Sequence, residues 1–337
     1  MTIKEVITSS EKTKIAEFLA RFSLKYEQNV DQTIYLEENG SVIATVSAAK
    51  YILKCLAVDP AYRSENYAVA LVGEMIKRLH ANGVFYYQVF TKPEYKDVFV
   101  SLGFSVLVET EKVVALEGGE GNVDQTIEKM RVQIRFTLGL DVAARRYDVA
   151  AVVLNGNPFT NGHLKLIEHA ACRHDYVFVF VLEEEGSYFS FNERYSLAYV
   201  ALKPLANVMV LPSSKYIVSK ATFPGYFLKT VDETTEQYAL FDATVFDKYF
   251  MKGLGISKRY IGSETSDYMS LYNQTLKRVF GDRVEEIPRF VEDGTVVSAK
   301  TVRALLEQGK EDDALKFVPH STHALLKGMV LLKNGKR

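Results

Sequence analysis

The spacing of apolar residues changes along the chain and predicts two different folds. In the first third, short apolar stretches alternate with amphipathic ones. The pattern predicts strands at TIYLEE, SVIATVSAA, ILKCLAVD and VFYYQVF, helices near residues 68–81 and at EYKDVFVSLG, and one more strand after them. Strands and helices mixed in this order are typical of a small α+β domain.

From about residue 147 onward the strands lose their alternation. They become near-continuous apolar runs, separated by helical stretches: VAAVVLN, VFVFVLEE, NVMVLP and RYIGSE. Such strands are buried on both faces, as in a parallel sheet covered by helices. We therefore expect an α/β protein in which an α+β domain precedes a doubly wound parallel-sheet domain, with short helices at the end.

The boundary between the two patterns is marked by LEGGEGNVD, residues 116–124. Its glycines and charges predict a linker. The apolar residues Ile127, Met130, Ile134 and Leu138 then repeat at helical spacing. We expect a front domain over residues 1–117, a linker and connecting helix over 118–146, and a second domain over 147–337.

Composition limits the classes of partner. Of 337 residues, 41 are basic and 42 acidic, and 47% are hydrophobic. A large core is expected, and no strongly basic face, so nucleic acid is not the expected partner. Cys55 and Cys172 lack metal-site spacing, and we expect free thiols. The N-terminal stretch is polar, and no apolar run is long enough to span a membrane. We expect a soluble cytoplasmic protein with no membrane partner.

The stretch NGNPFTNGH, residues 155–163, connects the first apolar strand of the second domain to a helix. Ligands of open α/β sheets bind at the carboxyl ends of the strands. Asn161 and Gly162 are expected to allow tight backbone geometry, and free N–H groups at the helix start favour an anion. Thr160 is expected to cap the helix, and His163 to donate to a phosphate oxygen. A capped helix with an exposed histidine is the alternative.

Two further stretches carry cations at predicted helix starts. In VSAKTVR, residues 297–303, Ser298 is an expected N-cap and Lys300 and Arg303 share one face. In FSFNERYSLAY, Arg194 lies in the first turn, where the helix dipole disfavours it, which indicates a function. Solvated surface charges are the alternative for both stretches.

These motifs together resemble the nucleotidyltransferase superfamily: Thr-x-Gly-His follows the first strand, and Val-Ser-x-x-x-Val-Arg comes late. Longer stretches resemble one branch of it, the citrate lyase ligase family. They are NPFTNGHLKLIEHA, FSFNERYSL, SKYIVSKATFPGYFLK, RYIGSETSDYMSLYNQTLKRVF and VSAKTVRALLEQG. An acetyltransferase-like domain ahead of a nucleotidyltransferase domain also matches that family, so the resemblance covers nearly the whole chain.

The resemblance implies an ATP-dependent ligase that activates acetate as acetyl adenylate. The acetyl group then passes to the thiol of a CoA-like prosthetic group on the acyl-carrier subunit of citrate lyase, with release of AMP and pyrophosphate. ATP and Mg²⁺ are the implied cofactors, and acetate and the carrier subunit are the implied partners. Such chemistry needs positioning and positive charge more than acid–base catalysis.

The expected site residues form three groups. Those expected to be catalytic are Thr160, His163, Lys300 and Arg303. Those expected to contact the nucleotide are Asn155, Asn157, Pro158, Phe159, Gly162, Arg194, Gly262, Glu264 and Ser298. Those expected to contact acetate or the prosthetic group are Arg63, Lys215, Ser219, Thr222, Phe223 and Tyr226, of which the last five lie in a loop that equally fits a packed connection.

The front domain departs from the N-acetyltransferase pattern that it resembles. Arg63 and Ala68 match the CoA-pyrophosphate motif of the GNAT family, but Asn66 replaces its first glycine. Phe99 stands where those enzymes often carry a tyrosine proton donor, and a phenyl ring cannot donate a proton. We expect this domain to dock the CoA-like arm or its carrier rather than to acetylate amines; a domain kept for packing is the alternative.

Three other functions remain open from the sequence. An adenylyltransferase acting on phosphopantetheine or a pyridine nucleotide would use the same Thr-x-Gly-His site. A regulatory protein would bind an acyl-CoA in the front domain without turnover. An aminoacyl-tRNA synthetase shares the histidine motif, but the near-neutral charge counts against it. The ligase is favoured because it alone accounts for both domains.

Overall fold

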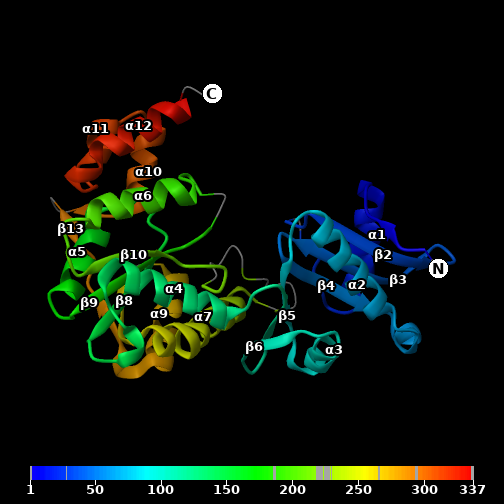
Figure 1. The fold of residues 1–337 in the computed structure, drawn as a ribbon. Helices are drawn as coiled ribbons and strands as arrows, with labels where there is room; N and C mark the ends of the chain where they lie inside the picture. Colours follow the sequence, from blue (N-terminus) through cyan, green and yellow to red (C-terminus); the bar gives the residue numbers. More distant parts are fainter. Residues whose placement is uncertain are drawn as a thin grey trace. The chain divides into compact units, whose positions relative to one another are not determined.

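The chain forms two compact units in the computed structural model (Figure 1). One unit comprises Met1–Asn122 with Phe223–Gln237, and the other comprises Val123–Thr222 with Tyr238–Arg337. The structure describes residues 2–27, 29–184, 187–217, 223, 228, 230–264, 266–292 and 295–334.

The first unit is built on a mixed sheet, which among the described residues has seven strands in the order β1-β2-β3-β4-β5-β7-β6. The strands are β1 (Lys4–Glu5), β2 (Gln32–Glu38), β3 (Ser41–Ala49), β4 (Ile52–Val58), β5 (Tyr86–Thr91), β6 (Ser105–Glu109) and β7 (Val114–Gly119). The helices are α1 (Ser9–Ala20), α2 (Tyr67–Ala81) and α3 (Lys96–Ser101). Strands β4 and β5 are parallel and their other neighbours antiparallel, so the expected α+β architecture is confirmed.

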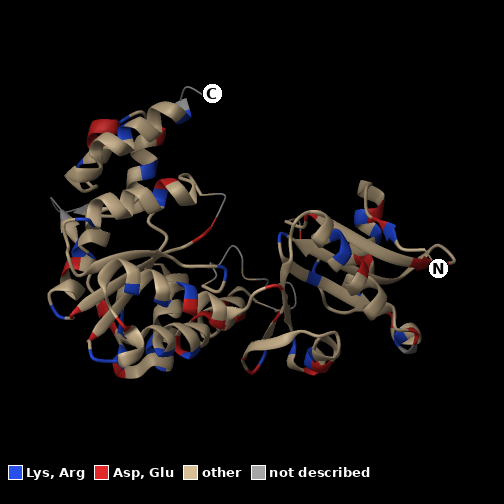
Figure 2. Cartoon of the chain, in the orientation of Figure 1, with Lys and Arg blue, Asp and Glu red and all other residues tan. Residues whose placement is uncertain are grey.

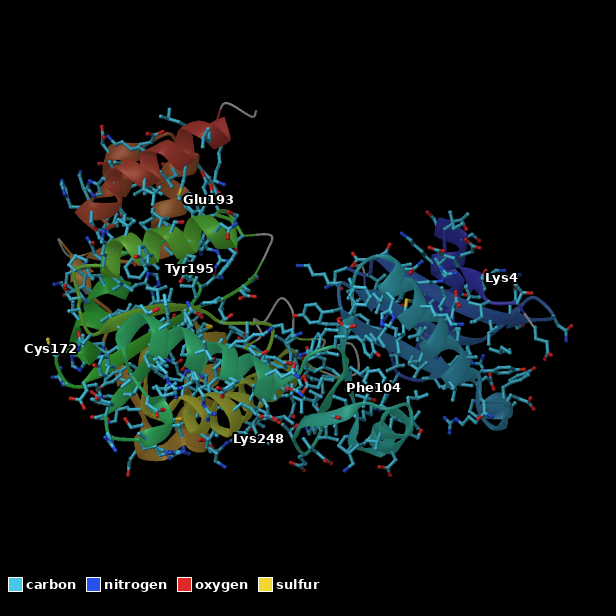
Figure 3. The ribbon with its side chains drawn as sticks, in the orientation of Figure 1. Lys4, Phe104, Cys172, Glu193, Tyr195 and Lys248 are labelled. Atoms are coloured by element: carbon cyan, nitrogen blue, oxygen red, sulfur yellow. The ribbon has the colours of Figure 1, made fainter. Side chains whose placement is uncertain are left out.

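Two positions in this unit explain the departures from the acetyltransferase pattern. Asn66 caps α2 with a φ of 56°, a conformation that asparagine tolerates better than most residues. Phe99 on α3 is 4% exposed, and its ring centroid lies 5.7 Å from that of Phe104 (Figure 3). Phe99 is therefore a core side chain in this unit.

The predicted linker is wrong over its first four residues, because β7 continues through Gly119. A Cβ atom at Gly118 would lie 2.5 Å from Cε2 of Tyr87, and Gly119 has a φ of 84° and faces the carbonyl of Phe85. Packing against β5 therefore requires these glycines, which sequence alone could not distinguish from linker glycines. The helix predicted from Ile127, Met130 and Ile134 is confirmed as α4 (Val123–Leu138).

The second unit contains a five-stranded parallel sheet, counted over the described residues, in the order β10-β9-β8-β11-β12. Its strands are β8 (Val149–Leu154), β9 (Tyr176–Val181), β10 (Val208–Pro212), β11 (Ile256–Gly262) and β12 (Val284–Ile287). The connecting helices are α5 (Asn161–Ala171), α6 (Phe191–Leu202), the part of α7 (Val231–Val245) from Tyr238 onward, a π-helical turn (Phe246–Met251), α8 (Lys252–Leu254) and α9 (Asp267–Phe280). The doubly wound sheet expected from the sequence is confirmed.

Both faces of this sheet are buried, which explains the unbroken apolar runs. On one face Val152, Val179 and Tyr260 join a core that includes residues of α5 and α6. On the other face the ring of Phe180 packs edge-on against those of Phe246 and Phe250, at centroid distances of 5.9 and 5.6 Å. Alternation is lost because neither side of a strand faces water.

The chain ends in small elements that pack on the second unit. They are β13 (Val291–Glu292), β14 (Thr295–Val296), α10 (Ala299–Glu307), α11 (Glu311–Leu315) and α12 (His323–Asn334). Lys and Arg residues are interspersed with Asp and Glu residues in both units (Figure 2). None of the described helices combines the length and the apolar character needed to cross a membrane.

Candidate active site

The candidate site lies where β8 ends, at the point where the strand order reverses between β8 and β11. In open α/β sheets this switch point forms the ligand crevice. The turn after β8 bends at Gly156, which has a φ of 61°, and contains a cis Asn157–Pro158 peptide bond. The sequence predicts that Gly162 is needed for a tight backbone at the helix start, and this prediction is wrong. The φ of Gly162 is not positive, and a Cβ atom added there would make only ordinary van der Waals contacts, from 3.5 Å outward.

Thr160 and His163 form the start of α5. Thr160 is the N-cap residue, as the sequence predicted, and its backbone N–H donates to Nδ1 of His163 over 3.0 Å. A histidine thus takes the place that Glu or Gln holds in a capping box. Because Nδ1 accepts this hydrogen bond, the neutral ring carries its own hydrogen on Nε2. The capped helix start and the phosphate donor, treated as alternatives from sequence, are compatible in this geometry.

The environment of His163 keeps its imidazole neutral. Removal of the ring from water, and then the positive charge of Arg289, lower the pKa of His163 to about 4. Its ring centroid lies 5.4 Å from that of the buried Phe159. At neutral pH, His163 therefore offers a fixed N–H donor and no charge.

This lowered pKa makes the protein acid-sensitive. Between about pH 6.5 and pH 4, the unfolded chain binds a proton at His163 that the folded chain excludes, so the free energy of unfolding falls as pH falls. A shift of this size corresponds to about 3 kcal/mol. We expect wild type to lose about that much more stability than His163→Gln between pH 7 and pH 4, by urea unfolding. Equal losses in the two proteins would contradict the lowered pKa.

The stretch VSAKTVR, residues 297–303, contacts the stretch NGNPFTNGH, residues 155–163, at this turn. Ser298 caps α10 by accepting a hydrogen bond from the N–H of Thr301 over 3.1 Å. Arg303, two residues further along α10, donates from its guanidinium to the carbonyl of Asn157. Val297 lies against Gly162, since a Cβ atom there would be 3.5 Å from the Val297 carbonyl oxygen. Lys300, also on the first turn of α10, is exposed.

Arg194 binds the backbone of the protein itself, and the direct nucleotide contact expected from the sequence stays a prediction. Its side chain is fully buried on α6. The guanidinium donates to four backbone carbonyls, at 2.5–3.1 Å; they belong to Asn155, Leu182, Glu184 and Phe189. Arg194 thereby connects the ends of β8 and β9 to the start of α6, which makes it a positioning residue.

Other polar groups surround the turn. Oδ1 of Asn155 is buried and has no hydrogen-bond partner in the described structure, while its Nδ2 donates to Glu184 over 3.3 Å. Oδ1 of Asn157 accepts from the N–H of Phe189 over 3.0 Å. A buried acceptor without a partner is costly unless a ligand supplies a donor, such as an adenine amino group or a ribose hydroxyl.

An acidic and a basic residue follow the carboxyl ends of β11 and β12. Gly262 ends β11 as predicted, and Glu264 follows it. The carboxylate of Glu264 is paired with Arg289, the second residue after β12. We did not predict Arg289 from the sequence. The available signal was its place after the last buried strand, in IPRF, because the carboxyl ends of parallel strands meet at one edge of the sheet.

The expected acetate and prosthetic-group residues are divided between the two units. Lys215 belongs to the second unit, and its ammonium lies 5.7 Å from the ring centroid of Tyr216. Phe223 belongs to the first unit, where its ring packs 5.7 Å from that of Phe90. Arg63 is exposed in the turn before α2. Ser219, Thr222 and Tyr226 lie outside the described residues, so their role stays a prediction.

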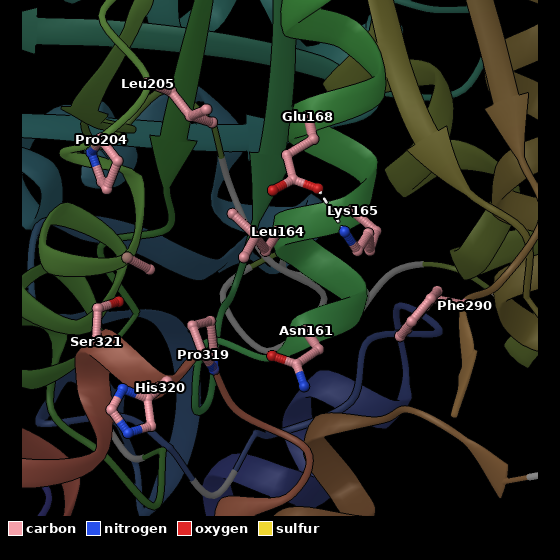
Figure 4. A pocket seen from close by; sticks show the side chains of 11 residues that line it. Asn161, Leu164, Lys165, Glu168, Pro204, Leu205, Phe290, Pro319, His320 and Ser321 are labelled. Carbon is pink, nitrogen blue, oxygen red and sulfur yellow. Dashed lines mark hydrogen bonds and ion pairs between the residues drawn. The ribbon is translucent and has the colours of Figure 1, made fainter. Parts of the chain in front are cut away.

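A pocket of about 390 Å³ adjoins the first turns of α5 (Figure 4). Its walls include Asn161, Leu164, Phe290 and Pro319, with the Lys165–Glu168 ion pair of 2.8 Å on the helix. No candidate site residue among the described positions lines it.

The described residues also contain no group of three or more His, Cys, Asp or Glu side chains arranged to hold a metal ion.

Comparison with known proteins gives a family for this arrangement. Residues 149–326, more than half of the chain, match the family model described as "Citrate lyase ligase C-terminal domain". The chain belongs to the citrate lyase ligase family. A citrate (pro-3S)-lyase ligase of Haemophilus influenzae is 28% identical over 96% of this chain and 97% of its own length. Another, of Klebsiella pneumoniae, is 29% identical over 93% of this chain and 91% of its own length.

Solved structures similar to about a third of the chain are acetyltransferases. An aminoglycoside 6'-N-acetyltransferase complexed with coenzyme A aligns over 35% of this chain and 97% of its own, with 12% identity and a TM-score of 0.31. The ribosomal-protein-S18-alanine N-acetyltransferase of Escherichia coli aligns over 36% and 97%, with 17% identity and a TM-score of 0.30.

Proposed function

We propose that this protein is an ATP-dependent ligase that acetylates the CoA-like thiol on the acyl-carrier subunit of citrate lyase, and thereby activates the lyase. The observation that carries the proposal is that one turn, residues 157–160, binds both His163 of α5, through the Thr160 N–H, and Arg303 of α10, through the Asn157 carbonyl, in a chain of this family. The substrates of this reaction are ATP and acetate, and it takes place in the cytoplasm.

In the first step, an acetate oxygen attacks the α-phosphorus of ATP, and the bond to the bridging oxygen of pyrophosphate breaks. Negative charge then gathers on the phosphate oxygens and on the leaving pyrophosphate. The Nε2–H of His163 and the cations of α10 are donors for that charge, since the N–H groups of Thr160 and Asn161 already bind His163 and the Phe317 carbonyl. A bound Mg²⁺ would supply positive charge that offsets part of the charge on the phosphates, and it would need few protein ligands.

In the second step, the carrier thiolate attacks the carbonyl carbon of acetyl adenylate, and AMP leaves. The acceptor supplies its own sulfur, so a catalytic cysteine is not required. Burial raises the pKa of Cys55 to about 12, which makes that thiol a poor nucleophile. Cys172 is exposed at the far end of α5 from His163.

Arg303→Ala tests the contact of α10 with the pyrophosphate end of ATP. We expect KM for ATP to rise about 10- to 100-fold, the value for a lost hydrogen bond to a charged group, with little change in KM for acetate. Steady-state kinetics at saturating acetate measure this change. Glu307→Ala, at the other end of the same helix, is the matched control. An unchanged ATP dependence would remove Arg303 from the phosphate site.

Isotope exchange tests the first step alone. Wild type incubated with ATP, Mg²⁺ and labelled pyrophosphate is expected to form labelled ATP only when acetate is present. An adenylyltransferase acting on phosphopantetheine or a pyridine nucleotide would show exchange with its own product and none with acetate. Exchange that ignores acetate would therefore reject the ligase function.

A further inference from the structure

Arg289 is a cation at the candidate site to which the proposed mechanism gives no role. It follows β12, and its Nε donates to the Ser263 carbonyl over 2.8 Å, while one terminal nitrogen pairs with Glu264. Its backbone N–H donates to the Ser263 hydroxyl over 3.0 Å. The other terminal nitrogen binds no residue that the structure describes. The guanidinium is thus fixed in direction with part of its donor set unused.

The packing of α5 brings its first turn toward Arg289. Helix α5 runs antiparallel to the strands, and near its end His169 lies 3.4 Å from Glu285 of β12. His163 is six residues earlier on the helix, a rise of about 9 Å. Arg289 is four residues beyond Glu285, about 13 Å further in an extended chain. Both residues therefore lie toward the carboxyl end of the sheet.

The chain after Arg289 leads directly to the other site elements. The carbonyl of Phe290 accepts from the N–H of Val297 over 3.1 Å, and Val297 lies against Gly162 on α5. The next residue, Ser298, caps the helix that carries Lys300 and Arg303. Residues 289–290 and 297–303 thus form one border of the site. The influence of Arg289 on the pKa of His163 agrees with this proximity.

We infer that Arg289 is a substrate-binding residue of this site, whose guanidinium binds an oxyanion of the reactants next to His163. Two reactants carry such a group, the triphosphate of ATP and the carboxylate of acetate. This inference rests on the proposed function for the identity of the reactants, but not for the presence of an anion site. Glu264 balances the charge of Arg289 in the absence of substrate.

A role in stability alone is the competing explanation. The two side chains of the Arg289–Glu264 pair are 27% and 25% exposed, and pairs in contact with water contribute little to stability. The planar guanidinium is also suited to two parallel hydrogen bonds with a carboxylate or phosphate, which a lysine cannot reproduce. The two explanations predict opposite effects when Glu264 is neutralised.

The test measures binding of ATP, inorganic pyrophosphate and acetate by calorimetry for wild type, Arg289→Gln, Arg289→Lys and Glu264→Gln. Arg283→Gln is the matched control, because Arg283 precedes the same strand at its other end and pairs with Asp247. We expect Arg289→Gln to weaken one class of anion about 10- to 100-fold, and Arg289→Lys to weaken it less. Glu264→Gln is expected to tighten the same anion, and Arg283→Gln to change nothing.

The pattern of losses identifies the anion. Weaker binding of ATP and pyrophosphate assigns Arg289 to the phosphates, and weaker binding of acetate alone assigns it to the carboxylate. Binding of all three within twofold of wild type, in folded Arg289 variants, would overturn the inference. If Arg289→Gln does not fold, Glu264→Gln decides, since weaker binding there indicates a purely structural pair. Failure of the proposed function would appear separately, as wild type that binds ATP without acetate-dependent exchange.

Discussion

Replacing His163 by alanine is expected to reduce acetyl-adenylate formation about 100- to 1000-fold while the protein stays folded. This is the range observed when one fixed donor to a developing oxyanion is removed. His163 combines a ring nitrogen held by the N–H of Thr160 with an environment that keeps the ring neutral. Rapid-quench measurement of acetyl adenylate in a single turnover reports this step directly.

Two variants separate the loss of the donor from the loss of the cap. In His163→Gln the side-chain amide can still accept from the Thr160 N–H, as glutamine does in capping boxes. We expect this variant to keep wild-type stability at pH 7 but to remain slow, because the amide does not reach as far as Nε2. His320→Ala, at an exposed position after α11, is the control. A wild-type rate in His163→Gln would remove the ring from the chemistry.

Arg194→Met is expected to lower the free energy of unfolding by about 4 kcal/mol or more. Each hydrogen bond to a charged group contributes about 1.5–3 kcal/mol, and four bonds to one guanidinium contribute less than their sum. The methionine fills space but leaves four carbonyls without their common donor. Urea unfolding at pH 7 measures the loss. Arg194→Lys keeps the charge but reaches fewer carbonyls, so an intermediate loss is expected.

Arg173→Met is the control for Arg194. The Arg173 guanidinium donates to the His169 carbonyl over 3.0 Å at the exposed end of α5, and we expect a change within about 0.5 kcal/mol. If Arg194→Met remained as stable as wild type but bound ATP poorly, Arg194 would contact the nucleotide directly, as first expected from the sequence.

Features that depend on local chemistry were predictable from the sequence. Thr160 and Ser298 are helix N-caps because their side chains and the following backbone are close in sequence. The parallel sheet was predictable because burial on both faces removes alternation from each strand. The end of β11 at Gly262 was predictable because the apolar run of that strand stops there.

Features that depend on contacts between distant segments of the chain were not predictable from the sequence. The four acceptors of Arg194 come from three separate parts of the chain, so its sequence position showed a need for partners but not their identity. Arg289 became evident only when the order of β11 and β12 was known. The glycines of β7 have a conformation and a packing that only the neighbouring strand explains.

The most direct test of the account is product analysis with the carrier. Wild type is mixed with ATP, Mg²⁺, labelled acetate and deacetylated citrate lyase carrier, and the products are separated. An ATP-dependent acetate ligase is expected to place one label on the carrier thiol for each AMP and pyrophosphate released, and to give active citrate lyase after reconstitution. An unlabelled carrier, together with a dinucleotide formed from phosphopantetheine or nicotinamide mononucleotide, would contradict it.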